Sequence, residues 1–208
     1  DQYDLLFYLT DGSSFEVNGF TFNDDCFASN FRTEDDYSVR SGEEYVSVHV
    51  VDCVFSGSIV NTFQLNGDRT ISESVCQGWF MTEVSGGSFV MDRVVAPYSD
   101  VEITIYAEDC DMTISESVFQ RGFVSEVSGG SFVMDRVVAT DGVVYLRAEE
   151  CDLTILSSSF VGNYALTLDA NMGATVLDSV LIAENEFLNM FLYSYGQTTF
   201  NNVTLANN

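Results

Sequence analysis

Residues Thr70 to Ala96 read TISESVCQGWFMTEVSGGSFVMDRVVA, and Thr113 to Ala139 read TISESVFQRGFVSEVSGGSFVMDRVVA. The two stretches lie 43 residues apart and differ at five positions. In a repeat of this kind, each unit buries its apolar side against its neighbours. The sequence therefore predicts a stack of similar turns.

One alternating pattern of inward and outward residues, with a bend in its middle, fits both halves of the 43-residue unit. After a wider first interval the pattern returns every 20 to 24 residues. We place its nine starts at Phe20, Val48, Arg69, Phe89, Met112, Phe132, Leu153, Ala174 and Thr198. Several extended stretches per turn, with few helix signals, predict an all-β fold, a right-handed parallel β-helix of about nine turns. Residues 1–208 form it as a single domain.

Two columns of equivalent inward residues are apolar along the whole chain, so we expect both to form the core. The second inward position reads Phe22, Val50, Ile71, Met91, Ile114, Met134, Ile155, Val176 and Phe200. The last inward position reads Phe27, Phe55, Cys76, Ala96, Phe119, Ala139, Phe160, Leu181 and Leu205. A third column, small or weakly polar, fits a tight bend and reads Cys53, Ser74, Val94, Ser117, Val137, Ser158, Ser179 and Val203.

The composition excludes several functions. The net charge is -25, with seven Arg and no Lys, whereas nucleic acids and anionic membranes are bound through a basic face. Without Lys, Walker-type phosphate loops and Schiff-base catalysis are also excluded. No apolar run approaches the ~18 residues of a membrane helix. The five Cys form no CxxC pair and no metal-finger spacing.

The charged segment Arg32–Glu44, in the wide first interval, is predicted to be a loop insertion that leaves the stack. The chain begins with Asp rather than Met and stops within a strand pattern at Asn208. We therefore expect a fragment of a longer secreted or cell-surface protein.

Short motifs in the turns resemble the pectin-lyase-like right-handed β-helix repeats, particularly those of polymorphic outer-membrane proteins. That type carries a Gly-Gly-small-apolar motif and a Phe-x-x-Asn motif. They read here Gly86-Gly87-Ser88-Phe89, Gly129-Gly130-Ser131-Phe132, Phe27-Ala28-Ser29-Asn30 and Phe160-Val161-Gly162-Asn163. The resemblance implies a surface-exposed adhesive or structural protein, often with an outer-membrane anchor.

Charges of opposite sign alternate along the outward column at the bend. It reads Asp24, Asp52, Glu73, Arg93, Glu116, Arg136, Ser157, Asp178 and Asn202. Equivalent residues of neighbouring turns lie ~4.8 Å apart, so the middle four predict an ion-pair ladder. Carboxylates beside Arg are also components of a polysaccharide lyase or glycoside hydrolase. For that alternative, the residues to test are Asp92, Asp135, Glu73 and Glu116.

A second outward column is rich in Thr and suggests ice binding as another alternative. Its threonines are Thr21, Thr70, Thr113, Thr154, Thr175 and Thr199. Exposed strands favour Thr and Val in any case. The single His of the chain, His49, shares this column, where a solvated or packing role is expected.

Two acidic turns are candidates for Ca²⁺, which prefers hard oxygen ligands. Their carboxylates are Glu108, Asp109, Asp111, Glu149, Glu150 and Asp152. Solvated acidic surface is the competing interpretation. The turns are two rungs apart, ~9.6 Å, so Cys110 and Cys151 are too distant for a disulfide. Both are expected to be buried thiols.

Together these patterns predict a non-catalytic extracellular or cell-surface module for structure or adhesion, with no required cofactor. Its expected partners are an extracellular polysaccharide or another surface protein. Nucleic acid is not an expected partner.

Overall fold

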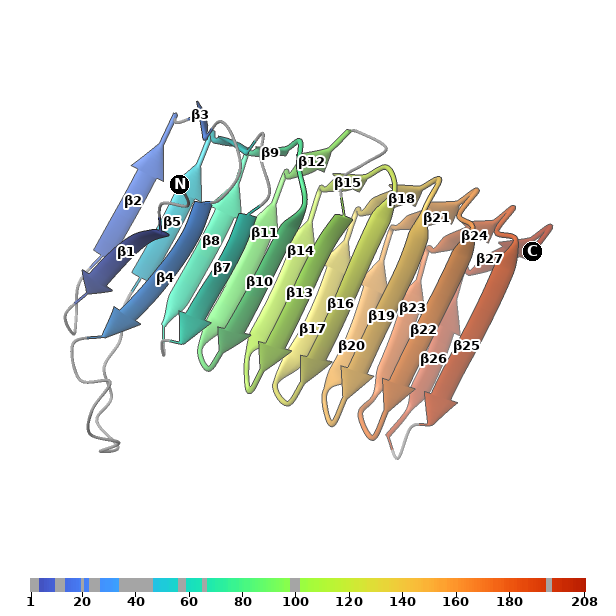
Figure 1. The fold of residues 1–208 in the computed structure, drawn as a ribbon. Coiled ribbons are helices and arrows are strands. Elements are labelled where there is room, and N and C mark those ends of the chain that lie inside the picture. The colour runs from blue at the N-terminus through green and yellow to red at the C-terminus, as the bar shows by residue number, and fades with distance from the viewer. Residues whose placement is uncertain are drawn as a thin grey trace.

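The computed structural model describes residues 4–9, 14–19, 21–22, 27–33, 47–55, 59–64, 67–97, 102–193 and 196–208. These residues form three parallel sheets of nine strands each, stacked as a β-solenoid (Figure 1). The predicted all-β parallel β-helix is therefore confirmed. None of the described segments is a helix that could serve as a membrane span.

Each turn of the chain contributes one strand to each sheet. Sheet A contains β1 Asp4–Leu9, β4 Phe27–Thr33, β7 Ile59–Gln64, β10 Phe80–Ser85, β13 Glu102–Glu108, β16 Gly122–Ser128, β19 Val143–Glu149, β22 Ala165–Asn171 and β25 Phe187–Tyr193. Sheet B contains β2 Ser14–Asn18, β5 Ser47–Val51, β8 Asp68–Ser72, β11 Ser88–Asp92, β14 Asp111–Ser115, β17 Ser131–Asp135, β20 Asp152–Leu156, β23 Thr175–Asp178 and β26 Thr198–Asn201. Sheet C contains β3 Thr21–Phe22, β6 Val54–Phe55, β9 Val75–Cys76, β12 Val95–Ala96, β15 Val118–Phe119, β18 Val138–Thr140, β21 Ser159–Val161, β24 Leu181–Ala183 and β27 Thr204–Ala206.

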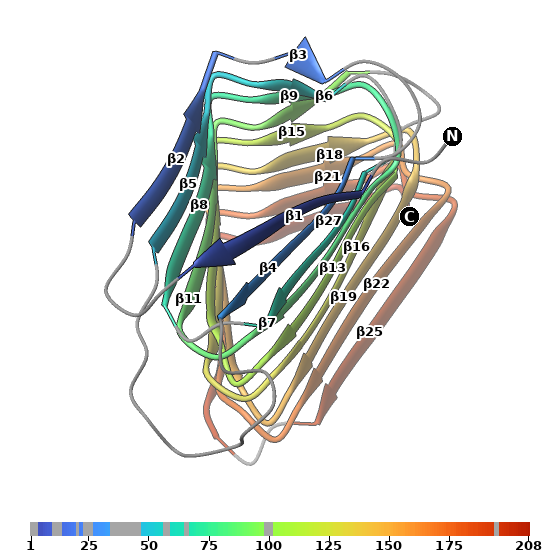
Figure 2. The same ribbon diagram turned by 60° about the vertical axis from the view of Figure 1, so that its left-hand side comes forward.

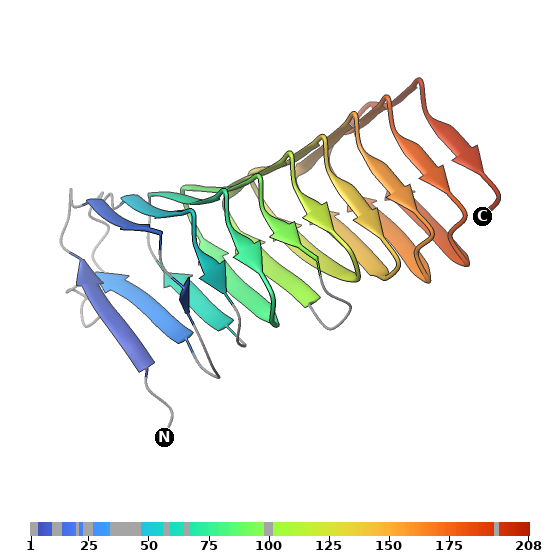
Figure 3. The ribbon, with the colours of Figure 1, turned by 90° about the horizontal axis from the view of Figure 1, so that it is seen from above.

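The three sheets form three walls around one interior, with the short strands of sheet C joining the longer walls A and B (Figure 2). The turns follow one another along a single axis (Figure 3). Of the extended stretches predicted in most turns, the last one, after the bend, corresponds to sheet A. Each outer face therefore runs the length of the stack, and its residues recur at the strand spacing of ~4.8 Å.

Phenylalanines and small side chains share the inward column of sheet C. The inward column of sheet C has Phe55, Phe119 and Phe160 separated by small residues at Cys76, Ala96 and Ala139, and all six are at most 3% exposed. Equivalent residues of neighbouring turns lie ~4.8 Å apart, so each ring of this column can fill space beside the small side chains of adjacent turns.

The bend between sheets B and C is built by a left-handed residue followed by a small inward one. Glu73, Arg93, Glu116 and Arg136 have φ between 48° and 55°. The hydroxyl of Ser117, in the inward column behind them, donates to the Ser115 carbonyl at 2.7 Å and accepts from the Val94 amide at 3.1 Å. Ser74 and Ser158 repeat this pattern. These serines satisfy buried backbone groups that the bend leaves without ladder partners.

The predicted start of the first turn at Phe20 is wrong. In the structure Phe15 pairs with Val48, and Phe22 pairs with Phe55, so Phe22 belongs to the last inward column. Gly19, at φ 72°, occupies the left-handed bend. Phe27, predicted in the last inward column, begins β4 of sheet A instead. Two apolar pairs five residues apart made both registers plausible, and the backbone freedom of Gly19 fits the observed one.

The eighth turn is also shifted by one residue from the prediction. Thr175 and Leu177 are fully buried and pair with Leu153 and Ile155, in place of the predicted Ala174 and Val176. Val180 and Ile182 likewise replace Ser179 and Leu181 inside. The adjacent apolar residues Val176 and Leu177 leave the alternation ambiguous. Ser179 instead takes the left-handed bend position, at φ 59°, that was predicted for Asp178.

The loop insertion predicted for residues 32–44 begins too early, because Arg32 and Thr33 are the last residues of β4. The remainder of that segment lies outside the described residues. Asp24 and Cys26 also lie outside them.

Candidate functional site

The outer face of sheet B pairs its polar side chains with one another. The Ser88 hydroxyl donates to Asp68 at 2.5 Å, and the Ser131 hydroxyl donates to Asp111 at 2.8 Å. In a parallel outer column of the same face, the Ser115 hydroxyl donates to Asp92 at 2.6 Å. Each pair joins neighbouring turns, so these carboxylates contribute to the stack itself.

The predicted ion-pair ladder at the bend consists of two separate pairs. Arg93 contacts Glu73 at 2.7 Å, and Arg136 contacts Glu116 at 2.8 Å. Each Arg also contacts the carboxylate that precedes it, Asp92 at 3.1 Å and Asp135 at 2.6 Å. Between Arg93 and Glu116 there is no ion pair in the described part of the chain.

The four carboxylates proposed for catalysis are therefore shared between two arginines, and the Arg and Glu side chains are about half exposed. They lie at the border of sheets B and C. The structure brings them together as two repeated copies, one in each 43-residue unit.

The Thr-rich column is shorter than predicted. Strand pairing brings Thr70, Thr113, Thr154 and Thr199 into one outer column of sheet B, where they alternate with Val90, Val133 and Val176. Thr21 lies in sheet C, and Thr175 is fully buried, so neither belongs to the column. His49 does occupy the column, as predicted.

The acidic turns lie at the junction of sheets A and B, with the Gly129-Gly130 turn between them. Their carboxylates have different partners. Asp152 accepts from the Ala174 amide at 2.8 Å, and Glu149 contacts Arg147 at 2.9 Å. Within the described residues, no group of three or more acidic, His or Cys side chains has the arrangement of a metal site.

Cys110 and Cys151 are buried thiols, as predicted, and Cys53 and Cys76 are buried as well. Burial raises the pKa of Cys76 to about 12 and that of Cys110 and Cys151 to about 11. These thiols are therefore protonated near neutral pH, which does not suit a nucleophile.

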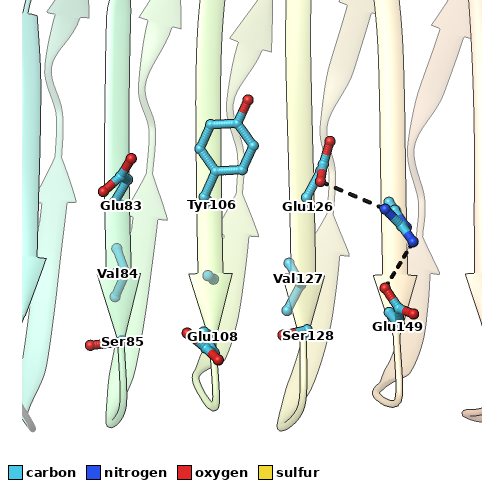
Figure 4. Close-up of a pocket in the computed structure, with 11 residues that line it drawn as sticks. Glu83, Val84, Ser85, Tyr106, Glu108, Glu126, Val127, Ser128 and Glu149 are labelled. Carbon is cyan, nitrogen blue, oxygen red and sulfur yellow. Dashed lines mark ion pairs between the residues drawn. The ribbon is translucent and has the colours of Figure 1, made fainter.

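The outer face of sheet A contains a hollow. A hollow of about 420 Å³ crosses β10, β13, β16 and β19. The outward side chains that line it are Glu83, Ser85, Tyr106, Glu108, Glu126, Ser128, Arg147 and Glu149 (Figure 4). Val84, Ala107 and Val127 complete its lining.

Arg147 is the only cation lining this hollow, and it lies between two carboxylates. It contacts Glu149 at 2.9 Å and Glu126 at 3.9 Å, and all three side chains are 38–42% exposed. The side-chain carboxylates of Glu83 and Glu108 have no hydrogen bond or ion pair within the described structure. Two acceptor groups of this face are therefore available to a ligand, in contrast to the paired carboxylates of sheet B.

Tyr106 and Tyr145 contribute aromatic rings to this side of the solenoid. Tyr106 lines the hollow and is 37% exposed, whereas Tyr145 lies in the neighbouring outer column. Burial raises the pKa of the Tyr145 phenol, opposed by Arg147 and reinforced by Glu126, Asp169 and Glu149. The phenol is therefore a hydrogen-bond donor at neutral pH.

The columns of sheet B and the bend give no sign of this hollow, because its lining comes from the outward positions of sheet A. The detectable signal is the alternation in Phe123–Ser128 and Val144–Glu149, whose outward positions carry Glu126, Arg147 and Glu149. Aligning those stretches places Glu126 and Arg147 side by side.

Comparison of the chain with protein-family models, curated proteins and solved structures found no match.

Proposed function

We propose that this chain is a non-catalytic module of an extracellular or cell-surface protein that contacts a polysaccharide through the outer face of sheet A. The observation that carries the proposal is the hollow across four successive strands, with Tyr106, Arg147 and the unpaired carboxylates of Glu83 and Glu108. A surface whose strands recur at a fixed spacing suits a polymer, because successive units of the polymer can each contact one strand.

The chemistry of the hollow favours a hydroxyl-rich polymer without acidic groups. Carboxylates accept hydrogen bonds from hydroxyl groups, and the face of a tyrosine ring packs on the apolar face of a sugar ring. A polyuronate would meet four Glu and a net charge of -25, so repulsion would oppose its binding. Neutral or amine-bearing polysaccharides are the expected class.

Two motifs support placing the chain with the pectin-lyase-like right-handed β-helix proteins, as part of this proposal. The Gly-Gly segments form the turns from sheet A to sheet B, where Gly129 and Gly130 have φ of 68°. Asn163, of the Phe-x-x-Asn motif, is buried and donates to Asn185 and to the Ala139 carbonyl. The other Phe-x-x-Asn match lies within β4, and does not form such a turn.

Affinity electrophoresis through gels containing neutral, amine-bearing or uronate polysaccharides tests the proposal. We expect a neutral or amine-bearing polymer to retard the chain, and Tyr106→Ala to abolish the retardation. Tyr164→Ala is the matched control, because Tyr164 is 58% exposed and packs edge-on against Phe187, outside the hollow. Equal retardation of both variants would contradict the assigned face, and no retardation by any polymer would contradict polysaccharide binding.

A polysaccharide lyase or hydrolase is the second candidate, and the placement of Arg147 between Glu126 and Glu149 favours it. Paired carboxylates are the usual acid and base of glycoside hydrolysis. The same polymers are incubated with the chain, and new reducing ends or unsaturated products are measured. Cleavage that Glu126→Gln abolishes would replace the non-catalytic proposal, whereas cleavage lost in Asp92→Asn or Asp135→Asn would move the site to the bend.

A further inference from the structure

The outer face of sheet C carries an apolar column that neither the stack nor the proposed function uses. Five successive turns present valine, and the column continues to a leucine beyond one serine. Val138 and Leu181 are 37% and 38% exposed, and the other valines are half-buried. The column reads Val54, Val75, Val95, Val118, Val138, Ser159 and Leu181.

The charged bend residues run along one border of this apolar column. In four successive turns they read Glu73, Arg93, Glu116 and Arg136, so their charges sum to zero. Elsewhere the chain is strongly acidic, with a net charge of -25. Asp92 and Asp135 contact the same arginines from sheet B, so the border is not neutral, but its two arginines lower the repulsion that another acidic molecule meets there.

We propose that this face binds a second copy of the chain, in a two-fold antiparallel dimer. The two-fold axis lies along the strands of sheet C and passes between the turns of Arg93 and Glu116. Reversing the order of the turns then places Arg93 opposite Glu116 of the other copy, and Glu73 opposite Arg136. The same operation places Val95 opposite Val118 and Val75 opposite Val138.

The charge order selects this arrangement over other pairings of the same faces. A two-fold axis along the solenoid would carry the charged border to the opposite side of the partner's sheet C, where the charges would have no counterparts. The antiparallel axis gives an isologous interface, in which each unlike pair occurs twice. Strands of two or three residues make the face narrow, so the dimer belongs with small, transient interfaces. Long-range repulsion makes it stronger in moderate salt than in very low salt.

Sedimentation equilibrium in ~0.15 M salt tests the pairing through charge reversal. We expect concentration-dependent dimers for the native chain, and weakening by roughly tenfold or more for either Arg93→Glu or Glu116→Arg alone. Mixing these two variants restores unlike charges at both contacts, so a heterodimer forms. The matched control is Arg136→Glu mixed with Glu116→Arg, which has the same total charge but leaves like charges opposed. A monomeric native chain, or equal association in the two mixtures, would overturn the proposal.

A substitution in the apolar column gives a second, independent readout. Val118→Lys places a charge at the centre of the face and should abolish dimerisation. Val133→Lys adds the same charge on the outer face of sheet B and should leave it unchanged. Circular dichroism of both variants verifies that the sheets remain folded. Dimerisation that survives Val118→Lys in a folded chain would contradict the assigned face.

Discussion

The outer faces of sheets A and B are built by the same turns, yet their carboxylates differ in whether they have hydrogen-bond partners. On sheet B, Asp68, Asp92 and Asp111 each accept a serine hydroxyl from the next turn. On sheet A, the carboxylates of Glu83 and Glu108 have no partner within the described structure and line a hollow. Sheet B therefore uses its polar groups for the stack, whereas sheet A leaves two carboxylates available to a ligand.

The largest expected effect comes from disturbing the turn that joins the two faces. A Cβ at Gly130 would lie 2.5 Å from the Cys110 carbonyl oxygen, at φ 68°. Gly130→Ala should therefore lower the free energy of unfolding by about 3 kcal/mol or more, through the clash and the strained backbone. Gly162→Ala is the control, because Gly162 has φ 69° but its nearest contact is at 3.8 Å. Chemical unfolding measures both, and equal losses would show that the backbone strain alone matters.

A pH-dependent effect concerns the shared interior rather than either outer face, and it appears as a loss of stability at alkaline pH. Burial raises the thiol pKa of Cys76 from 9.0 to about 12 in the folded chain. The Cys76 thiol ionises above about pH 9 in the unfolded chain, whereas in the folded chain it stays protonated until about pH 12. The free energy of unfolding should therefore fall as the pH rises from about 9 toward 12, by up to ~1.4 kcal/mol per pH unit for each thiol.

Cys76→Ala provides the control for this titration, because alanine already occupies the equivalent inward position at Ala96 and Ala139. Its unfolding free energy should decline less steeply above pH 9. If the unfolding free energy of Cys76→Ala fell as steeply as that of the native chain, groups other than Cys76 would control the loss of stability at alkaline pH.

Thr175→Val tests which residues belong to the outer face of sheet B. The Thr175 hydroxyl is buried and has no hydrogen-bond partner. Replacing it with a methyl group of similar shape should raise the free energy of unfolding by about 1 kcal/mol. Thr154→Val, at a half-buried outward position, should change it by less than ~0.5 kcal/mol. A loss of stability in Thr175→Val would contradict the observed register of the eighth turn.

The smallest expected effect concerns the acidic turns between sheets A and B. With ionic strength held constant, millimolar Ca²⁺ and Mg²⁺ should raise the melting temperature equally and slightly, because both neutralise repelling carboxylates. Thermal unfolding after chelator treatment gives the reference. A rise specific to Ca²⁺ would instead indicate a site among Glu108, Asp109, Asp111, Glu149, Glu150 and Asp152.

Much of the fold could be predicted because the interior alternates so regularly between Val48 and Phe160. The register failed at Phe20 and Ala174, where adjacent apolar residues fit either face. In these two turns the register follows from the residue with positive φ at the bend, which is Gly19 in the first and Ser179 in the eighth. The hollow of sheet A could not be predicted from the columns of sheet B and the bend, because its lining comes from the outward positions of four strands of sheet A.

Comparing two double substitutions tests most directly whether the faces differ in this way. Asp92→Asn with Asp111→Asn weakens two charge-assisted hydrogen bonds on sheet B and removes the Asp92–Arg93 ion pair, and should lower the free energy of unfolding by about 1–3 kcal/mol. Glu83→Gln with Glu108→Gln removes two unpaired charges from sheet A, and should leave it unchanged or raise it slightly. Both variants lose the same charge, so general repulsion cancels in the comparison. Equal changes, or a larger loss on sheet A, would contradict the account.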